Sequence, residues 1–352
     1  MKKVTIGMLI ASGICIISGT ALTAAGVASG GKAGLQITEN GIRTADDIKE
    51  AVRTTEDLNN AKRLILNVEG LYLNVTESDS FAVSWKCPED EFEVEKREKG
   101  DTVEITVKQK KQPEAYISMF DMGASVQECE IQVTIPENKT LDSLEIAGDY
   151  EMIDLEDFSV KTLKAVSESG TINCENVQAL AAELQSDNGQ IYCKGMQGKT
   201  LMTITESAEV DLNKITYNEW KAKSEQGEIR GDKIMAQKAD VQTEDSSVNL
   251  SGLDGSTIKV VSDNGDIYLD MNESLEGYHL KLYSKYGSTY VDEEEVMPEE
   301  DRYPDDEEVS VEALEEKADS NKQARNVYEQ NKDAGKSVEV SCREGQIDIT
   351  GK

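Results

Sequence analysis

The sequence predicts an all-β protein whose main part is a β-solenoid, similar to a parallel β-helix, built from 19-residue repeats. A hydroxyl residue recurs every 19 positions over six units without slippage, each followed by an acid and, two positions after it, a small residue. Apolar and polar residues alternate on both sides of these quartets, as in half-buried strands. A unit of this length cannot bury its own apolar face, so the units must stack.

The amino-terminal segment predicts a membrane anchor. Lys2 and Lys3 precede 28 uncharged residues, 4–31, which exceed the roughly 20 needed to cross a bilayer. We expect 1–34 to be a single-pass transmembrane helix with the lysines on the cytoplasmic side. A cleaved signal peptide is the alternative, with small residues near Ala24 for cleavage. Both place the rest of the chain outside the cell.

Two segments separate this anchor from the repeats. Residues 35–61 predict a linker with a short helix, because Thr44 can cap a segment in which Ile48 and Val52 recur near helical spacing. Residues 62–147 predict a β lead-in segment, because their apolar residues alternate with a period of two.

Residues 148–352 predict the solenoid. The hydroxyl column is Ser167, Ser186, Thr205, Ser224, Thr243 and Ser262. Five positions after each hydroxyl comes a β-branched residue: Ile172, Ile191, Val210, Ile229, Val248 and Ile267. Stacked strands would place like residues about 4.8 Å apart in buried columns. Leucine-rich repeats have a similar length, but their asparagine column is missing here.

The repeat becomes irregular near both ends. GDYEMIDL from Gly148 lies one period before Ser167, and SKYGSTYV begins at Ser284. We expect CREGQIDI, from Cys342, to close the stack. Residues 292–336 between these units predict an acidic insertion on the surface that folding does not require, because 292–316 carry 14 acids and one arginine.

These features resemble a known family. The lead-in VTIPENKTLDSLEI and the repeated S-x-x-G-x-I units are similar, over about residues 60–350, to the putative-adhesin family of β-strand-repeat domains of unknown function, found in envelope proteins of Gram-positive bacteria. The resemblance implies a surface-exposed, membrane-anchored protein, and some members resemble components linked to envelope-stress signalling. It implies no catalytic residues, because none are established in the family.

Charge and motifs exclude several functions. The 69 acids and 37 bases give a net charge of −32, which would repel nucleic acid. The single histidine, His279, and the lack of HExxH, GxSxG and GxGxxG motifs predict no catalytic or cofactor-binding residues. An enzyme acting on cell-wall glycan is the alternative. A cleft lined with aromatic residues would support it, and the repeats supply few of them, chiefly Trp220, Tyr192 and Tyr268.

The acids that follow the hydroxyl column are the only candidate metal ligands. Stacked at one turn they would repel each other, and Ca²⁺ would relieve that repulsion. Acids splayed into solvent are the preferred interpretation, because no calcium-binding motif is present. The ladder consists of Glu168, Asp187, Glu206, Glu225, Glu244 and Asp263.

The cysteines predict core thiols rather than a bridge. Cys174 and Cys193 lie one period apart in a column that is leucine elsewhere, although adjacent strands are close enough for a disulfide.

Together these observations predict a non-enzymatic, membrane-anchored extracellular solenoid that offers a binding, adhesion or sensing surface at the bacterial cell envelope. Its expected partners are the membrane, through the amino-terminal helix, and an envelope or signalling protein. No metal or cofactor is expected.

Overall fold

The computed structural model describes residues 35–38, 41–44, 52–58, 60–89, 91–110, 115–117, 129–149, 152–296 and 327–352. The anchor expected at 1–34 and most of the acidic insertion therefore lie outside the described residues. Within the described residues, no helix is long and apolar enough to cross a membrane.

The chain divides into two compact units. The smaller unit includes an antiparallel three-stranded sheet of β1 (Leu35–Thr38), β2 (Gly41–Thr44) and β9 (Ala115–Ile117). The larger unit comprises Thr55–Ser84, Glu95–Val107 and Glu130–Lys352. The larger unit contains the repeats.

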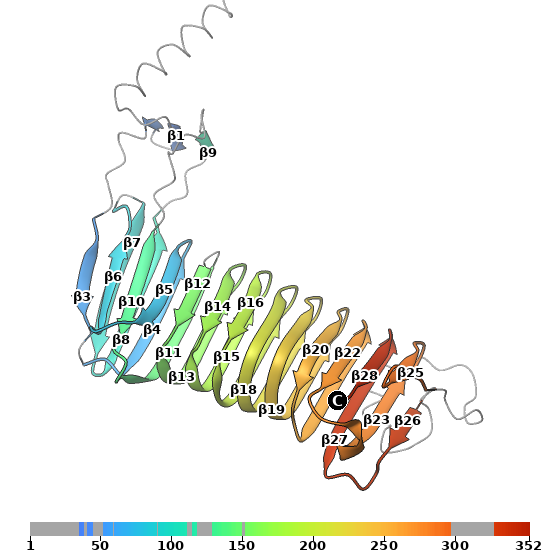
Figure 1. Ribbon diagram of the computed structural model, residues 1–352. Helices are drawn as coiled ribbons and strands as arrows, with labels where there is room; N and C mark the ends of the chain where they lie inside the picture. The colour runs from blue at the N-terminus through green and yellow to red at the C-terminus, as the bar shows by residue number, and fades with distance from the viewer. Residues whose placement is uncertain are drawn as a thin grey trace, which may run out of the picture. The chain divides into compact units, whose positions relative to one another are not determined.

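Each repeat forms one rung of a parallel solenoid, with one short and one long strand (Figure 1). The short strands are β12 (Met152–Glu156), β14 (Thr171–Glu175), β16 (Gln190–Lys194), the first part of β18 (Glu209–Ser224), the first part of β19 (Ile229–Thr243), β20 (Val248–Leu253) and β22 (Ile267–Met271). The long strands are β11 (Thr140–Asp149), β13 (Ser159–Ser167), β15 (Gln178–Ser186), β17 (Gln197–Thr205), the second parts of β18 and β19, and β21 (Thr257–Asn264).

Neighbouring rungs pair in parallel with an offset of one period, as Ile172 with Ile191 and Leu163 with Ala182 show. We call the two resulting surfaces the short-strand sheet and the long-strand sheet. The β-branched column that the sequence predicts is buried throughout: Ile172, Ile191, Val210, Ile229, Val248 and Ile267 are all 0% exposed. The predicted solenoid is confirmed.

The hydroxyl column caps the turn that follows each long strand. The Ser167 Oγ accepts a hydrogen bond from the Gly170 amide at 2.8 Å, and Ser224 makes the same bond to Gly227 at 2.8 Å. The Ser186 Oγ donates to the Gly170 carbonyl of the preceding rung at 3.0 Å. Ser167 and Ser224 therefore close their own turns, whereas the Ser186 hydroxyl joins two successive turns.

The small residue in each quartet is explained by the neighbouring rung. A Cβ built at Gly189 would lie 1.8 Å from the Gly170 carbonyl oxygen, and one at Gly227 would lie 1.8 Å from that of Ala208. The two larger members of this column, Ala208 and Ser246, are each followed by a glycine in the next rung. At Gly189 and Gly227, whose φ angles are not positive, close stacking restricts the position to a small residue.

A second turn, between each short strand and the next long strand, does require the left-handed conformation. One residue of this turn has a φ between 54° and 68° in six successive rungs. These residues are Asp157, Asn176, Gly195, Lys214, Lys233 and Gly252. The column has the 19-residue period, but its two lysines hide it in the sequence, because lysine rarely adopts this conformation.

The carboxyl-terminal rungs stack in a different order from that predicted. β27 (Lys336–Glu344) lies between β21 and β23 (Tyr278–Ser284), and β28 (Ile347–Thr350) lies between β22 and β24 (Thr289–Val291). The Cys342 unit is therefore the penultimate rung, and the Ser284 unit closes the stack (Figure 1). In this order Cys342 occupies a position of the hydroxyl column, between Ser262 and Ser284. The Cys342 thiol can take the place of a serine hydroxyl there, because it lies 3.4 Å from the Gly265 carbonyl oxygen.

The amino-terminal end is built in the same way. β4 (Arg63–Glu69) lies between β11 and β8 (Thr102–Gln109), and β5 (Tyr72–Glu77) lies between β12 and β10 (Glu130–Ile135). The parallel ladder thus continues through position 148 into the lead-in segment.

The other described strands lie near these ends. They are β3 (Thr54–Asp57), β6 (Ala82–Lys86), β7 (Phe92–Lys99), β25 (Glu294–Glu295) and β26 (Val327–Gln330). β25 pairs antiparallel with β24, and β26 pairs antiparallel with β23. The only helical turn in the described residues is the 3-10 turn Leu275–Gly277.

The structure corrects part of the expectation of a short helix within 35–61. The start of that helix falls on residues 45–51, which lie outside the described residues, but Thr54–Asp57, in its expected second half, form β3, which pairs with β6. Strand pairing overrides the weak helical spacing, because β-branched residues such as Thr54 and Thr55 suit strands.

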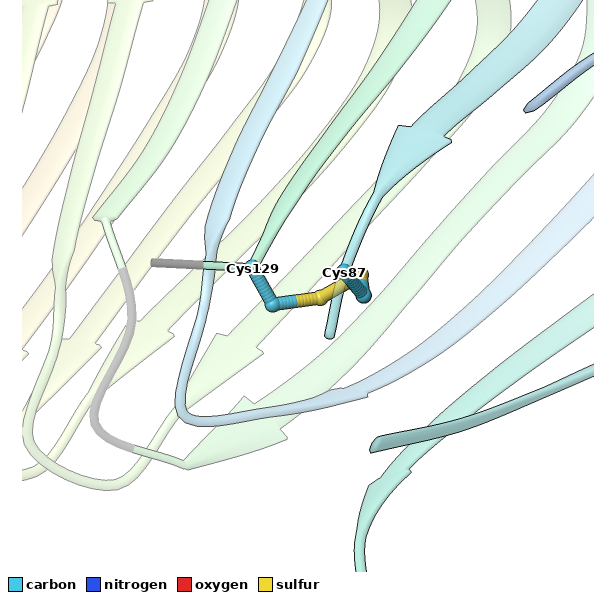
Figure 2. Close-up of a disulfide and its surroundings, with 2 residues drawn as sticks. All are labelled: Cys87 and Cys129. Atoms are coloured by element: carbon cyan, nitrogen blue, oxygen red, sulfur yellow. A yellow bond between two sulfur atoms is a disulfide. The ribbon is translucent and has the colours of Figure 1, made fainter. Parts of the chain in front are cut away.

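Two cysteines form a disulfide that spacing did not reveal. Cys87, after β6, is bonded to Cys129, before β10 (Figure 2). Their separation of 42 residues gives no local motif. The other described cysteines, Cys174, Cys193 and Cys342, are free and buried, which confirms the prediction of core thiols for the first two.

Candidate binding surface

The acidic ladder follows the turns after the long strands. Four of its members are exposed and two, Asp187 and Asp263, are half-buried. Backbone bonds continue through these turns, for example from the Asn188 amide to the Glu168 carbonyl at 2.9 Å. Among the described residues, no three acidic, cysteine or histidine side chains are grouped so that they could hold a metal ion. Acids splayed into solvent stay the prediction for this ladder, and a bound cation stays the alternative.

The single histidine has a structural contact. His279 on β23 lies 2.9 Å from a carboxylate oxygen of Glu329 on β26. The pair links the last long strand to the antiparallel strand that covers its edge.

The residues named for an enzymatic cleft do not come together. Trp220 is 0% exposed and packs between the sheets, next to Leu201 and Ala239 in its column. Tyr192 and Tyr268 both belong to the short-strand sheet but are four rungs apart, about 19 Å at the usual strand spacing. These three side chains therefore cannot line one cleft.

Charge is distributed unequally between the two sheets. In the central rungs, the outward positions of the long-strand sheet carry the lysines Lys161, Lys164, Lys199, Lys221, Lys223, Lys238 and Lys259, against the acids Glu183, Glu219 and Asp240. The corresponding positions of the short-strand sheet carry the acids Glu175, Glu209, Asp211, Asp232 and Asp270, against Lys194 and Arg230. The short-strand sheet is thus the more acidic surface and attracts cations.

The described residues contain a hollow on the long-strand sheet, with a volume of about 410 Å³. It extends over several rungs, its floor includes Ala181 and Leu201, and charged residues such as Lys164 and Glu183 lie at its side. The Lys164 Nζ and Glu183 Oε1 atoms form a salt bridge of 2.6 Å. This pair therefore offers no unpaired charge to a ligand in the hollow.

The middle column of the short-strand sheet combines aromatic, amide and carboxylate side chains. From the amino-terminal end it reads Asn74, Asp154, Asn173, Tyr192, Asp211, Arg230, Asn249, Tyr268, Asp348 and Tyr290. We call it the tyrosine column. Near the start of the column, the side chains form hydrogen bonds with their neighbours. Asp154 accepts one from the Tyr72 hydroxyl and one, at 3.2 Å, from the Asn173 side-chain amide.

At the far end of the tyrosine column, a buried polar atom lacks a hydrogen-bond partner. Asp348 stands between Tyr268 and Tyr290, and its Oδ1 atom is buried without a hydrogen-bond partner. Burial raises the pKa of Asp348, and the neighbouring Glu293 raises it further. The sequence alone does not reveal this group, because its three residues adjoin only when the Cys342 unit is the penultimate rung.

Comparison with known proteins gives one family match. The family model described as Toastrack DUF4097 matches residues 61–350. No curated protein matches this chain.

Solved structures similar to the chain include two proteins whose names refer to adhesion. A putative adhesin from Bacteroides fragilis NCTC 9343 is 12% identical, with a TM-score of 0.38, and the match covers 86% of this chain and 97% of that one. A putative cell adhesion protein from Clostridium sporogenes is 12% identical, with a TM-score of 0.21, over 86% of this chain and 100% of that one.

Proposed function

The chain belongs to the Toastrack DUF4097 family, and from this premise we propose that it is a non-enzymatic binding, adhesion or sensing protein of the bacterial cell envelope. The observation that carries the proposal is the stack itself. Two sheets display outward side chains in fixed columns along rungs that are hydrogen-bonded to their neighbours, which suits a preformed recognition surface.

The disulfide supports a location outside the cytoplasm. Cys87 and Cys129 can remain bonded in an oxidising environment, whereas cytosolic thiols are kept reduced. The uncharged span 4–31 would deliver the chain there and hold it in the membrane by a single pass, with the repeats extracellular. An envelope or signalling protein would then be the partner, and no metal or cofactor is needed.

The glycan-acting enzyme is the weaker alternative. Its expected aromatics are separated, with Trp220 buried and Tyr192 and Tyr268 four rungs apart. No observation on the two sheets favours a reaction over binding.

The test of this proposal is the topology of the full-length protein in intact cells. After carbonate washing it should stay with the membranes, and external protease should remove the repeats. In the denatured protein, a thiol reagent should label Cys87 and Cys129 only after reduction. Protection of the repeats in intact cells, or free thiols at both positions before reduction, would contradict the proposal. A soluble mature form beginning near Gly26 would show a cleaved signal instead of an anchor.

A further inference from the structure

We propose that Tyr268, Asp348 and Tyr290 form a binding site for an organic ammonium group, with the cation above the carboxylate and between the two aromatic rings. The inference rests on the proposed binding role and deepens it by naming a class of ligand.

The register of the strands places the three residues together. Tyr268 on β22 is directly opposite Asp348 on β28, which is directly opposite Tyr290 on β24. Side chains at paired positions point to the same face, and Cα atoms two rungs apart are about 9.6 Å apart. Asp348 is therefore one strand spacing, about 4.8 Å, from each tyrosine position, a spacing compatible with the roughly 6 Å range of a cation–π contact. Tyr268 is 37% exposed, so the face is open to a ligand.

Asp348 supplies the charge that an ammonium group needs. Within the described residues its Oδ1 atom is buried and accepts no hydrogen bond. A buried carboxylate oxygen without a partner is costly, and a bound cation would remove that cost. The raised pKa of Asp348 reflects the same lack of compensation.

The neighbouring carboxylate, that of Asp266, already accepts hydrogen bonds. Asp266, on the rung of Tyr268, accepts the Gln346 amide at 2.8 Å and the Tyr268 hydroxyl at 3.4 Å. Asp348 is thus the carboxylate of this group that remains available to a ligand.

The same column contains an internal comparison. Tyr192 and Asp211 adjoin in the same way as Tyr268 and Asp348, but the next residue of that column is Arg230. The Arg230 guanidinium pairs with Glu228 at 2.7 Å and with Glu209. These two carboxylates, and to a smaller extent Asp211, raise the pKa of Arg230, so the protein places its own cation beside Asp211. At Asp348 the corresponding neighbour is Tyr290, an aromatic ring that can contact a cation but cannot provide one.

The donor set favours an organic ammonium over a metal ion. Hard divalent cations require six or more oxygen ligands, whereas this group offers the carboxylate of Asp348, with Glu293 beside it, and two aromatic rings. Aromatic rings around a carboxylate are suited to alkylammonium groups, which are weakly hydrated and large.

To test the proposal, the purified full-length protein in detergent is titrated with choline. Binding is observed by saturation-transfer NMR of the choline methyl protons. Its uncharged isostere 3,3-dimethylbutanol is titrated in parallel. We expect choline to bind and the isostere to bind at least tenfold more weakly, on the order of the loss of one charge-assisted contact. Equal binding of the two probes, or no binding of choline, would overturn the proposal.

Three variants locate the site. Asp348→Asn should weaken choline binding by about tenfold, and Tyr268→Leu and Tyr290→Leu by about fivefold each. Tyr192→Leu is the matched control in the same column and should leave binding unchanged. Asp348→Asn preserves shape, so it decides the question even if a tyrosine variant fails to fold. Unchanged binding in Asp348→Asn would overturn the site, and it would leave the membrane topology of the protein unaffected.

Discussion

The central rungs and the end rungs follow the same 19-residue pattern but are held together differently. In the centre each rung stacks on its neighbour in sequence, as Ile191 does on Ile172. At the ends a strand from a distant part of the chain is inserted: Leu64 pairs with Leu144, and Ile258 pairs with Val338, each 80 residues away. A repeat pattern therefore defines the structure of a rung, whereas the order of the rungs also depends on contacts that the repeat does not encode.

The largest effect is expected from a charge placed in the central core. Ile229 is 0% exposed and is covered by Val210 on one side and Val248 on the other. Ile229→Asp should destabilise the protein by several kcal/mol, on the order of 4, because an unpaired carboxylate would be buried. Urea unfolding measures this loss. The control Arg230→Gln on the outer face should change little, and unchanged stability in Ile229→Asp would contradict stacked columns.

A smaller loss tests the inserted strand directly. Val340 on β27 and Val241 on β19 are both 0% exposed and have neighbours on both sides. Val340→Ala should cost as much as Val241→Ala, about 2 kcal/mol in each case, because both leave a cavity in a covered core. The two unfolding curves should shift together. A much smaller cost for Val340→Ala would mean that β27 behaves as a frayed edge and would contradict its penultimate position.

The left-handed turns of the central rungs predict a gain of stability. Lys214 has a φ of 55°, which glycine adopts without strain. Lys214→Gly should stabilise the protein by up to about 1 kcal/mol, measured by urea unfolding. Gly195→Ala, in the preceding rung, is the opposite change. Its φ is 68° and its Cβ would lie 2.5 Å from the Asn176 Oδ1, so it should destabilise. Effects of the same sign in both variants would argue against a conformational cause.

The smallest effect is expected from shortening the acidic insertion. Replacing residues 297–326 by a Gly/Ser linker of about ten residues should leave the melting temperature nearly unchanged, because closure entropy depends only weakly on loop length. The wider deletion 293–333 also removes β26 and the contact of Glu329 with His279, so it should lower the melting temperature. If both deletions lowered it equally, the segment 297–326 would itself contribute to stability.

The sequence was sufficient for the interior of a rung. The period of 19 identified the column of Ile229, because stacked strands require like residues at like positions. It did not identify the order of the last two rungs, because Cys342 replaces the serine of the quartet and the units at 284 and 342 share the same alternation. It also missed the bond between Cys87 and Cys129, which depends on how distant strands meet.

The site was less predictable than the fold for the same reason. Tyr268, Asp348 and Tyr290 come from three strands whose adjacency follows only from the inserted rung. The acidic ladder, in contrast, could be read directly from the repeat, because all six members occupy one position of it. A binding site whose residues come from strands distant in the sequence cannot be found by searching for residues that recur at a fixed period.

The penultimate position of β27 has a consequence for the way the chain folds. Ser284 follows Ser262 by only 22 residues, so β23 is synthesised before β27 and can reach the exposed edge of β21 first. Local contacts form faster than distant ones, and both strands carry the apolar alternation that this edge accepts. Direct stacking of β23 on β21 would therefore compete with the native order during synthesis, and β23 would have to leave that edge before β27 could occupy it.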